Sequence, residues 1–437
     1  RRSGKRRRGA RTKALTSRLA ARLALAGLIT GIVLVSGCAS TGPVESRPSP
    51  TLPPAPGGIP AKTQPAPATE LPKPAPAPTA VPTPAPPKPP AAYPSEREGR
   101  ALVAGFLPPG VKDRDGWSGD IFTAFSALRI PPTPDNICAV IAVIEQESTF
   151  QADPVVPGLS QIVQKEIDAR RERLHLPRLL VDAALLKTSP DGRSYKARID
   201  ALRTEKQMND LFDDMISELP NGRSLLGGYN PVRTGGPMQV SVAFAEEHVT
   251  EKAYPYPRRG SVRSEVFTRR GGVYFGTAIL LDYPAPYSKL LYRFADFNAG
   301  RYSSRNAAFQ AAVARIGGQP LALDGDLLRY TGGVPASEPS TTLSALQRIA
   351  SRLGLSGAEI SRDLRLEKTA RFAQTALYTR VFALAEGAAG GHFPREAMPQ
   401  IDLKSPKIQR KLTTGWFAER VDWRHRTCLG RDRSALP

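Results

Sequence analysis

The residues with the clearest chemical potential follow an apolar run. Positions 137–144 carry no charge, and Glu145, Glu147 and Ser148 come directly after them. A carboxyl group that continues an apolar surface is poorly hydrated, which favours its neutral form and raises its pKa. Such a carboxyl can act as a general acid near neutral pH. The other interpretation of this stretch is an ordinary, solvated helix end.

A helix is expected to position these carboxyl groups. Thr133 before Pro134 is a typical helix start, with Thr as the N-cap and Pro at the first helical position. The pattern therefore predicts a buried helix over about 134–149. At helical spacing Glu147 shares a face with the apolar side chains three and seven positions earlier, whereas Glu145 points away from that face. Glu147 is therefore the candidate acid of the pair.

The net charge of +21 over 437 residues is unevenly distributed. Ten of the 61 Lys and Arg residues lie in 1–22, which leaves 51 against 40 acidic residues, a net charge of +11. This surplus favours solubility or anionic partners such as lipid head groups and acidic cell-wall peptides. The sequence shows no nucleic-acid-binding motif and no basic residues interleaved with aromatic ones, so no nucleic-acid partner is expected.

The first 95 residues predict a secreted, membrane-anchored protein. Residues 1–37 combine a basic start with an apolar run, as in a signal peptide. The run ends in Val-Ser-Gly-Cys38, which resembles the lipobox of bacterial lipoproteins. That resemblance implies lipidation of Cys38 and, because Ala39 follows, an outer membrane lipoprotein that faces the periplasm; an uncleaved anchor helix is the alternative. Residues 38–95 are rich in proline and predict an extended tether.

The cysteines and histidines suggest no metal site. Cys38, Cys138 and Cys428 do not have zinc-ligand spacing, and the four histidines form no cluster, so neither a metal nor a cofactor is expected. With Cys38 lipidated, Cys138 and Cys428 remain in a compartment that permits oxidation. We therefore expect a disulfide between them, with two buried, unpaired thiols as the alternative.

The pattern of apolar residues predicts a mainly α fold with short turns. A domain at 96–335 is expected to carry an insertion at about 159–228, whose charged clusters are interpreted as solvated helix faces, and 336–437 is expected to form a C-terminal helical region. Helices are expected at 117–128, 161–174, 177–186, 196–219, 241–247 and 274–281, before the C-cap Gly300, and as two amphipathic helices within 341–389.

Four short segments resemble the motifs of soluble, lysozyme-like lytic transglycosylases, in the same order. Glu147-Ser-Thr-Phe resembles their Glu-Ser-x-Phe, and Gly-Pro-Met238-Gln239 resembles their Gly-Leu-Met-Gln. Tyr-Phe-Gly-Thr at 274–277 lies where that family has Tyr-Gly-Thr, and Phe297-Asn298-Ala-Gly resembles Tyr-Asn-Ala-Gly. The resemblance covers roughly residues 133–312, and the whole chain looks like a branch of proteobacterial envelope lipoproteins.

This resemblance implies a fold, a reaction and a set of site residues. The fold would be a lysozyme-like helical domain with a long helical insertion and a C-terminal helical extension. The reaction would cleave bonds between N-acetylmuramic acid and N-acetylglucosamine in peptidoglycan glycan strands and leave 1,6-anhydro ends. Glu147 would be the single general acid and base. The substrate-binding residues would be Ser148, Met238, Gln239, Phe297 and Asn298.

The sequence also departs from the family pattern, which keeps other functions open. A long insertion separates the first two motifs, and Gly158–Gln161 within it is a possible decoy for the second motif. Phe297 replaces the tyrosine of the family pattern. Tyr274 or Tyr302 would have to supply the missing hydroxyl. Asp153 and Asp296 are spare carboxylates that would permit hydrolysis if either faced Glu147. The alternatives are a non-catalytic, peptidoglycan-binding envelope lipoprotein and an assembly adaptor that binds a protein partner through 336–437.

Overall fold

The computed structural model describes residues 93–258, 260–287, 289–331, 334–403 and 412–431. The signal peptide, Cys38 and nearly all of the tether lie outside these ranges. The described part of the chain is mainly α-helical, as the sequence predicts, and its strands are two-residue pieces paired in antiparallel hairpins. Three hydrophobic cores organise these helices.

The first core is built around the predicted central helix. The helix α4 (Pro134–Glu147) begins where expected, and the hydroxyl of Thr133 accepts a hydrogen bond from the backbone N–H of Asn136 at 3.3 Å. All eight side chains of 137–144 are buried. The partners of α4 in this core are α2 (Glu96–Phe106), α3 (Arg114–Leu128), α10 (Val242–Glu251), α11 (Val262–Val266), α12 (Arg269–Leu281), α13 (Leu290–Ala299) and α19 (Thr414–Leu429).

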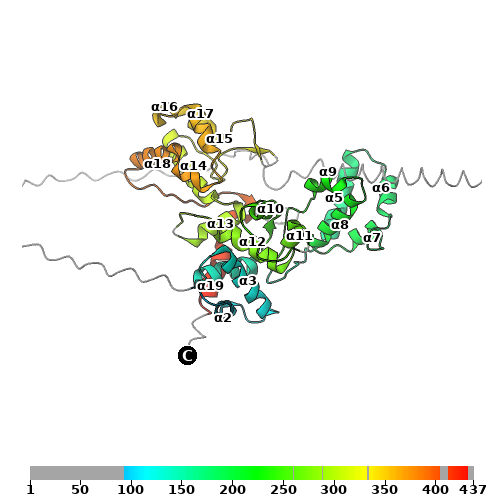
Figure 1. Cartoon of the computed structure of the whole chain (residues 1–437). Helices are drawn as coiled ribbons and strands as arrows, with labels where there is room; N and C mark the ends of the chain where they lie inside the picture. The colour runs from blue at the N-terminus through cyan, green and yellow to red at the C-terminus, as the bar shows by residue number, and fades with distance from the viewer. Residues whose placement is uncertain (1–92, 259, 288, 332–333, 404–411, 432–437) are drawn as a thin grey trace, which may run out of the picture. The chain divides into compact units, whose positions relative to one another are not determined.

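The C-terminal helix α19 belongs to this first core, although more than a hundred residues separate it from α13 in the sequence. It packs against both α4 and α13, and Figure 1 shows it beside α2 and α3. A disulfide joins Cys138 on α4 to Cys428 on α19, with an S–S distance of 1.99 Å and both residues fully buried. These are the two cysteines that the sequence analysis pairs. The chain end therefore holds the helix that carries Glu147.

The insertion forms its own small core between the first two motifs. Its apolar side chains include Leu159, Tyr195, Phe212 and Met215, and Figure 1 shows its helices gathered in one group. They are α5 (Leu159–Arg173), α6 (Arg178–Leu185), α7 (Tyr195–Asp200), α8 (Glu205–Ser217), α9 (Gly222–Leu226) and the 3₁₀ turn η1 (Gly227–Tyr229).

The expectation of one helix over 196–219 is wrong, because the chain breaks between α7 and α8. Thr204 has an extended backbone (φ −129°, ψ 155°) and caps α8. Its hydroxyl accepts from the backbone N–H of Gln207, whose side chain in turn accepts from the backbone N–H of Thr204. This reciprocal capping box satisfies donors that a continuous helix would otherwise bond internally, so it fixes a new helix start.

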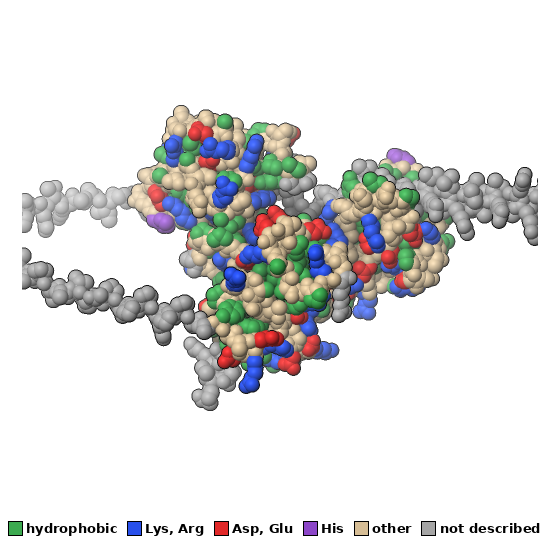
Figure 2. Space-filling model, in the orientation of Figure 1, with side chains coloured by type: hydrophobic (Ala, Val, Ile, Leu, Met, Phe, Trp, Pro, Cys, Tyr) green, Lys and Arg blue, Asp and Glu red, His purple; other side chains and the backbone are tan. Residues whose placement is uncertain are grey.

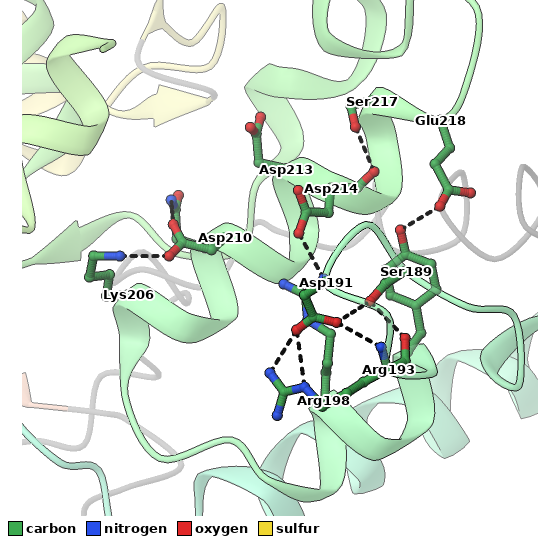
Figure 3. A network of polar contacts seen from close by, with 12 residues as sticks. Ser189, Asp191, Arg193, Arg198, Lys206, Asp210, Asp213, Asp214, Ser217 and Glu218 are labelled. Atoms are coloured by element: carbon green, nitrogen blue, oxygen red, sulfur yellow. Dashed lines mark hydrogen bonds and ion pairs between the residues drawn. The ribbon is translucent and has the colours of Figure 1, made fainter. Parts of the chain in front are cut away.

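Several charged side chains of the insertion bind each other rather than face solvent alone (Figure 3). Asp191 accepts hydrogen bonds from the Arg193 side chain and backbone and from Ser189, and these hold its pKa well below the usual range. Arg198, nearly buried, donates to Asp214 at 2.7 Å. These contacts tie the loop before α7 and α7 itself to α8. The interpretation of these charges as a solvated face is therefore wrong for Arg198.

The second core lies in the C-terminal half and begins earlier than the predicted boundary at 336. It includes α14 (Ser303–Gly317), and Figure 1 shows α14 to α18 together. The hairpin of β3 (Tyr330–Thr331) and β4 (Val334–Pro335) follows α14 in the sequence. The expectation of two helices in 341–389 is too coarse, since Gly354, with φ 60°, ends one helix and Ser356 caps the next. The elements are α15 (Thr341–Arg348), α16 (Ala350–Leu353), α17 (Gly357–Leu364), η2 (Ala370–Gln374) and α18 (Ala376–Ala389), followed by β5 (Asp402–Leu403) and β6 (Leu412–Thr413).

The surface carries both signs of charge. Basic and acidic side chains are interspersed over the face that Figure 2 shows. On this face the mixed distribution favours the solubility interpretation of the net charge. Among the described helices, none combines the length and the apolar character that crossing a bilayer requires.

Candidate functional site

Glu147 is the last residue of α4, directly after the buried apolar turns. Its side chain is only partly exposed. Within the described ranges its carboxyl group forms no hydrogen bond and no ion pair. Burial among protein atoms raises the pKa of Glu147 to about 7, and the negative charge of Glu205 adds to the effect. A carboxyl group in this setting holds a proton near neutral pH and can still be reached from solvent, as a general acid requires.

Glu145, two residues earlier, has a structural environment. Its carboxyl accepts from Arg424 on α19 at 2.9 Å and from Arg431 at 3.3 Å. Arg424 also donates to Gln146 at 3.1 Å. These ion pairs lie between α4 and α19, so Glu145 contributes to helix packing, and the two glutamates of the motif have different environments, as the helical spacing predicts.

The residues after Glu147 turn the chain away from the helix. The Ser148 hydroxyl donates back to the carbonyl of Ile144 at 3.0 Å and is buried. Thr149 and Phe150 both have positive φ, 50° and 58°, a conformation uncommon outside glycine. The Phe150 ring packs edge-on against Trp117, with centroids 5.2 Å apart. The structure thus gives the Ser148 hydroxyl a helix-capping contact.

The second motif is a tight turn between β1 (Thr234–Gly235) and β2 (Val240–Ser241). Gly236 has φ 72°, which favours glycine. Met238 is fully buried and packs closely against Gly276 on α12. A Cβ atom added at Gly276 would lie 2.4 Å from the Met238 sulfur, so only glycine fits at this contact. Gln239 is half-buried, and its side-chain oxygen accepts from the Thr234 hydroxyl at 3.2 Å. Met238 therefore anchors the turn while Gln239 stays at its rim.

The decoy for this motif has a different environment. Gly158 precedes α5, and Gln161 is exposed on that helix. Leu159 is buried in the core of the insertion. The segment therefore helps to form the insertion.

The last motif, Phe297-Asn298-Ala-Gly, ends α13. Gly300, with φ 109°, follows Ala299 as the C-cap, as the sequence predicts, and its N–H donates to the backbone carbonyl of Asp296 at 2.8 Å. Phe297 is partly buried against the first core. The side-chain oxygen of Asn298 accepts a hydrogen bond from the hydroxyl of Thr414 on α19 at 2.9 Å. Phe150, Met238, Tyr274 and Phe297 all pack in the first core, so this core carries all four motifs.

Of the two tyrosines that could replace the missing hydroxyl of Phe297, Tyr274 has its hydroxyl engaged in other contacts. The Tyr274 hydroxyl lies 3.1 Å from Nε2 of His248 and donates to the carbonyl of Ala253. Tyr302 is buried, with Arg305 stacked 4.3 Å from its ring centroid. The Tyr274 hydroxyl is therefore occupied by residues outside the Phe297 segment.

Asp296, one of the two spare carboxylates, is a buried structural group rather than a solvated helix residue. It accepts from the hydroxyls of Tyr283 at 3.1 Å and Tyr287 at 2.6 Å. The backbone N–H groups of Tyr302 and Ser304 donate to it at 2.8 and 2.7 Å. Burial raises its pKa. With its oxygens occupied in this way, Asp296 holds the start of α14 rather than facing Glu147.

Asp153, the other spare carboxylate, joins the segment after Glu147 to the insertion. Its carboxyl accepts from the Thr204 hydroxyl at 2.9 Å, and burial raises its pKa. Two residues later Val155 pairs with Thr204, and the N–H of Val156 donates to the carbonyl of Arg203 at 2.8 Å. These contacts hold the chain after Glu147 against the start of α8.

Glu205 is a further candidate residue, which the sequence alone does not single out. It is the first residue of α8, immediately after the capping Thr204, and is half-buried. Its charge acts on the carboxyl of Glu147. The capping box of Thr204 and Gln207 is visible in the sequence and would have located the helix start. Its proximity to Glu147 depends on the pairing of the insertion with residues 153–156, which no local pattern reveals.

Two further features of the described residues concern possible ligand sites. No group of three or more His, Cys, Asp or Glu side chains in the described ranges is arranged to hold a metal ion. A surface hollow of about 530 Å³ is lined by Gly105, Leu107, Pro109, Gly110, Arg114 and Arg431. None of the sequence-predicted site residues lines it.

The fold and these residues define a mainly α-helical protein whose central helix ends in a poorly hydrated carboxyl group. A family model described as "Protein of unknown function (DUF1615)" matches residues 110–431, and the chain belongs to this family. It is 54% identical over 329 residues to the "Uncharacterized protein YaiW" of Escherichia coli (strain K12), an alignment that covers 75% of this chain and 89% of that protein. No solved structure matches the chain.

Proposed function

We propose that this protein is a lytic transglycosylase of lysozyme-like type that cleaves peptidoglycan glycan strands. The observation that supports this proposal is the environment of Glu147, a carboxyl with a pKa of about 7 at the partly exposed end of a buried helix. The turn of Met238 and Gln239 and the end of α13 at Asn298 share its core. The order of these motifs in the sequence supports the same reaction.

In the proposed reaction Glu147 acts first as an acid and then as a base. Its carboxyl proton passes to the glycosidic oxygen, and the bond from that oxygen to C1 of N-acetylmuramic acid breaks. The substrate acetamido group stabilises the positive charge at C1. The Glu147 carboxylate then takes the proton of the 6-hydroxyl, and O6 bonds to C1 to close the 1,6-anhydro ring. One carboxyl with a raised pKa suffices for this cycle, and no cofactor is needed.

Glu205 supports a second candidate reaction at the same site. Its charge acts on Glu147, and a second carboxylate near the scissile bond is what a two-carboxylate glycosidase requires. In that case Glu205 would take a proton from water, water oxygen would bond to C1, and the products would carry reducing ends. The identity of the new sugar end therefore separates the two reactions.

The test is digestion of purified sacculi, with separation of the released muropeptides by mass. We expect 1,6-anhydro products from the wild type and none above background from Glu147→Gln, which keeps the shape of the side chain but cannot donate the proton. The matched control is Glu145→Gln, because the Glu145 carboxylate forms ion pairs with Arg424 and Arg431. This control should cleave at the wild-type rate. Protein that binds sacculi equally well in both forms and releases nothing would instead be a non-catalytic peptidoglycan-binding lipoprotein.

We further propose that Cys38 anchors the protein in the outer membrane. The lipobox and the basic, apolar segment before it support this proposal. Labelled palmitate should enter the wild-type protein and not Cys38→Ala, and equal labelling of the two would contradict it. A protein partner of residues 336–437 is a separate proposal, which a pulldown that survives removal of the first 335 residues would support.

A further inference from the structure

The start of α19 contacts the end of α13 through one buried side chain. Thr414 is the first residue of α19 and is fully buried. Its hydroxyl donates to the side-chain oxygen of Asn298 at 2.9 Å, and its backbone N–H donates to the carbonyl of Ile401 at 3.0 Å. The lysozyme-like motifs all lie before residue 301, so this contact comes from a segment outside the family-like region.

This hydrogen bond fixes which end of the Asn298 amide is available. An amide has an acceptor oxygen and a donor NH₂ group. The oxygen is used by Thr414, whereas Nδ2 donates to no other residue within the described ranges. Asn298 is half-buried, so the NH₂ group keeps access to solvent. An amide held in this way recognises an acceptor oxygen on a ligand, such as the carbonyl of an acetamido group.

The position of Thr414 is itself fixed by contacts between α19 and α4. The disulfide of Cys138 and Cys428 joins these helices, and Arg424 bridges them through Glu145. The same helix α4 ends in Glu147. The chain end therefore connects the residue that would bind the sugar to the helix that would deliver the proton.

We propose that Thr414 is a positioning residue of the sugar-binding site, which holds the Asn298 amide so that Nδ2 donates to the acetamido carbonyl oxygen of an N-acetylated glycan. This proposal rests on the proposed function and adds the C-terminal helix to its site. It assigns to α19 a part in substrate recognition besides its part in the core.

The experiment measures the binding of a tetramer of N-acetylglucosamine, and the cleavage of sacculi, by the full chain. In Thr414→Val the methyl groups keep the shape but the hydroxyl is lost. One hydrogen bond of this kind corresponds to about 2- to 13-fold in affinity. We expect the dissociation constant and KM to rise within this range while kcat changes less. Thr414→Ser should restore both, because it keeps the donor.

The control is the neighbouring Thr413, whose hydroxyl caps α19 by accepting from the N–H of Trp416 at 3.1 Å. Thr413→Val should lower the melting temperature and leave KM unchanged. A tetramer of glucosamine, which lacks the acetamido group, should bind Thr414→Val and the wild type alike. If Thr414→Val does not fold, Asn298→Asp provides the second test, since it keeps the acceptor for Thr414 and loses the Nδ2 donor.

The outcomes distinguish this proposal from the proposed function. If the wild type cleaves sacculi and Thr414→Val has the same KM, the positioning role is wrong and the function stands. The positioning role is also wrong if the deacetylated tetramer loses affinity equally, because the effect is then a general disturbance of the site. If the wild type neither binds the acetylated tetramer nor releases muropeptides, both proposals fall.

Discussion

Glu147 and Glu367 are two carboxyl groups with a raised pKa and opposite surroundings. Burial raises the pKa of each to about 7. Glu367 is fully buried in the second core, and its oxygens accept from the backbone N–H groups of Leu327 and Leu328 and from the Tyr330 hydroxyl. Glu147 is partly exposed and has no such donors among the described residues.

The difference teaches that a raised pKa alone does not locate a catalytic acid. The carboxyl of Glu367 is held by donors from one loop, so it fixes residues 327–330 against the chain after α17, and a substrate could not reach its proton. The carboxyl of Glu147 is poorly hydrated and still accessible. Accessibility and the lack of donors, rather than proton affinity, make Glu147 the candidate for chemistry.

The largest expected effect is a loss of activity on changing Glu147, whereas changing Glu367 should affect stability alone. Glu147→Gln should lower the rate of sacculus cleavage by about 10²–10⁴-fold, the usual cost of losing a general acid or base. Its melting temperature at pH 7 should hold or rise, because glutamine cannot ionise in a poorly hydrated position. Glu367→Gln should keep the rate and lower the melting temperature. Equal loss of rate in both variants would remove the distinction.

The disulfide provides the next largest effect and involves the first core alone. Replacing Cys138 and Cys428 with serine should destabilise the protein by roughly 2–5 kcal/mol, since the cross-link restricts the unfolded chain. Urea unfolding of this variant and of the wild type measures the loss. Hydrogen exchange should increase in α4 and α19 and stay unchanged around Glu367. Two free thiols in freshly isolated protein would contradict the pairing.

Truncating Glu367 should have a smaller cost that is confined to stability. Glu367→Ala leaves the buried N–H groups of Leu327 and Leu328 without their acceptor, which costs about 1–3 kcal/mol. The expected result is a lower urea midpoint with unchanged sacculus cleavage. Tyr330→Phe is a milder control, because it removes one donor and leaves the carboxyl in place.

The pH dependence of stability follows from the raised pKa of Glu367. The folded state binds the proton more tightly than the unfolded chain, whose carboxyl ionises near pH 4.5. The stability that this provides is fully present below about pH 4.5 and is lost as the pH rises through about 7. The raised pKa of Glu147 changes stability with pH in the same direction. Urea titrations should therefore compare Glu147→Gln with the double variant Glu147→Gln/Glu367→Gln, which differ only at Glu367. The double variant should show the flatter profile.

The sequence predicts those features that depend on neighbouring residues. The start of α4 at Thr133 and the end of α13 at Gly300 are confirmed because caps are local interactions. The split between α7 and α8 was missed although the capping box of Thr204 marks it, since the apolar periodicity continues across the break. The mainly α character followed from the periodicity of apolar residues over the chain.

The rest depends on contacts between distant segments. Asp296 reads as a solvated helix residue, yet the two tyrosines and the start of α14 enclose it. Thr414 and Asn298 are far apart in the sequence, and only the packing of α19 on α13 brings them into contact. No single-sequence pattern encodes such pairs, because each partner is an ordinary polar residue in its own segment.

The smallest expected effect is a shift of the pH profile, and it concerns Glu205. A nearby negative charge opposes the ionisation of Glu147 and raises its pKa, so Glu205→Gln should lower that pKa. Glu147 works as an acid only when it is protonated, so wild-type kcat/KM should fall as the pH rises through about 7. In Glu205→Gln this fall should occur at lower pH, with a similar rate on the acidic side.

Glu205→Asp is the matched control for this shift, because it keeps the charge at the start of α8 and should leave the profile close to that of the wild type. Asp153 is the other carboxyl on this segment, and its surroundings include the charges of Lys206 and Asp210. Asp153→Asn therefore tests whether any charge change at this segment has the same effect. If Glu205→Gln instead loses about 10²–10⁴-fold in rate at every pH, and the wild-type products carry reducing ends, Glu205 is the base of a two-carboxylate hydrolase. The direction and size of this one change thus decide whether the insertion tunes the acid of a transglycosylase or supplies the second catalytic group of a hydrolase.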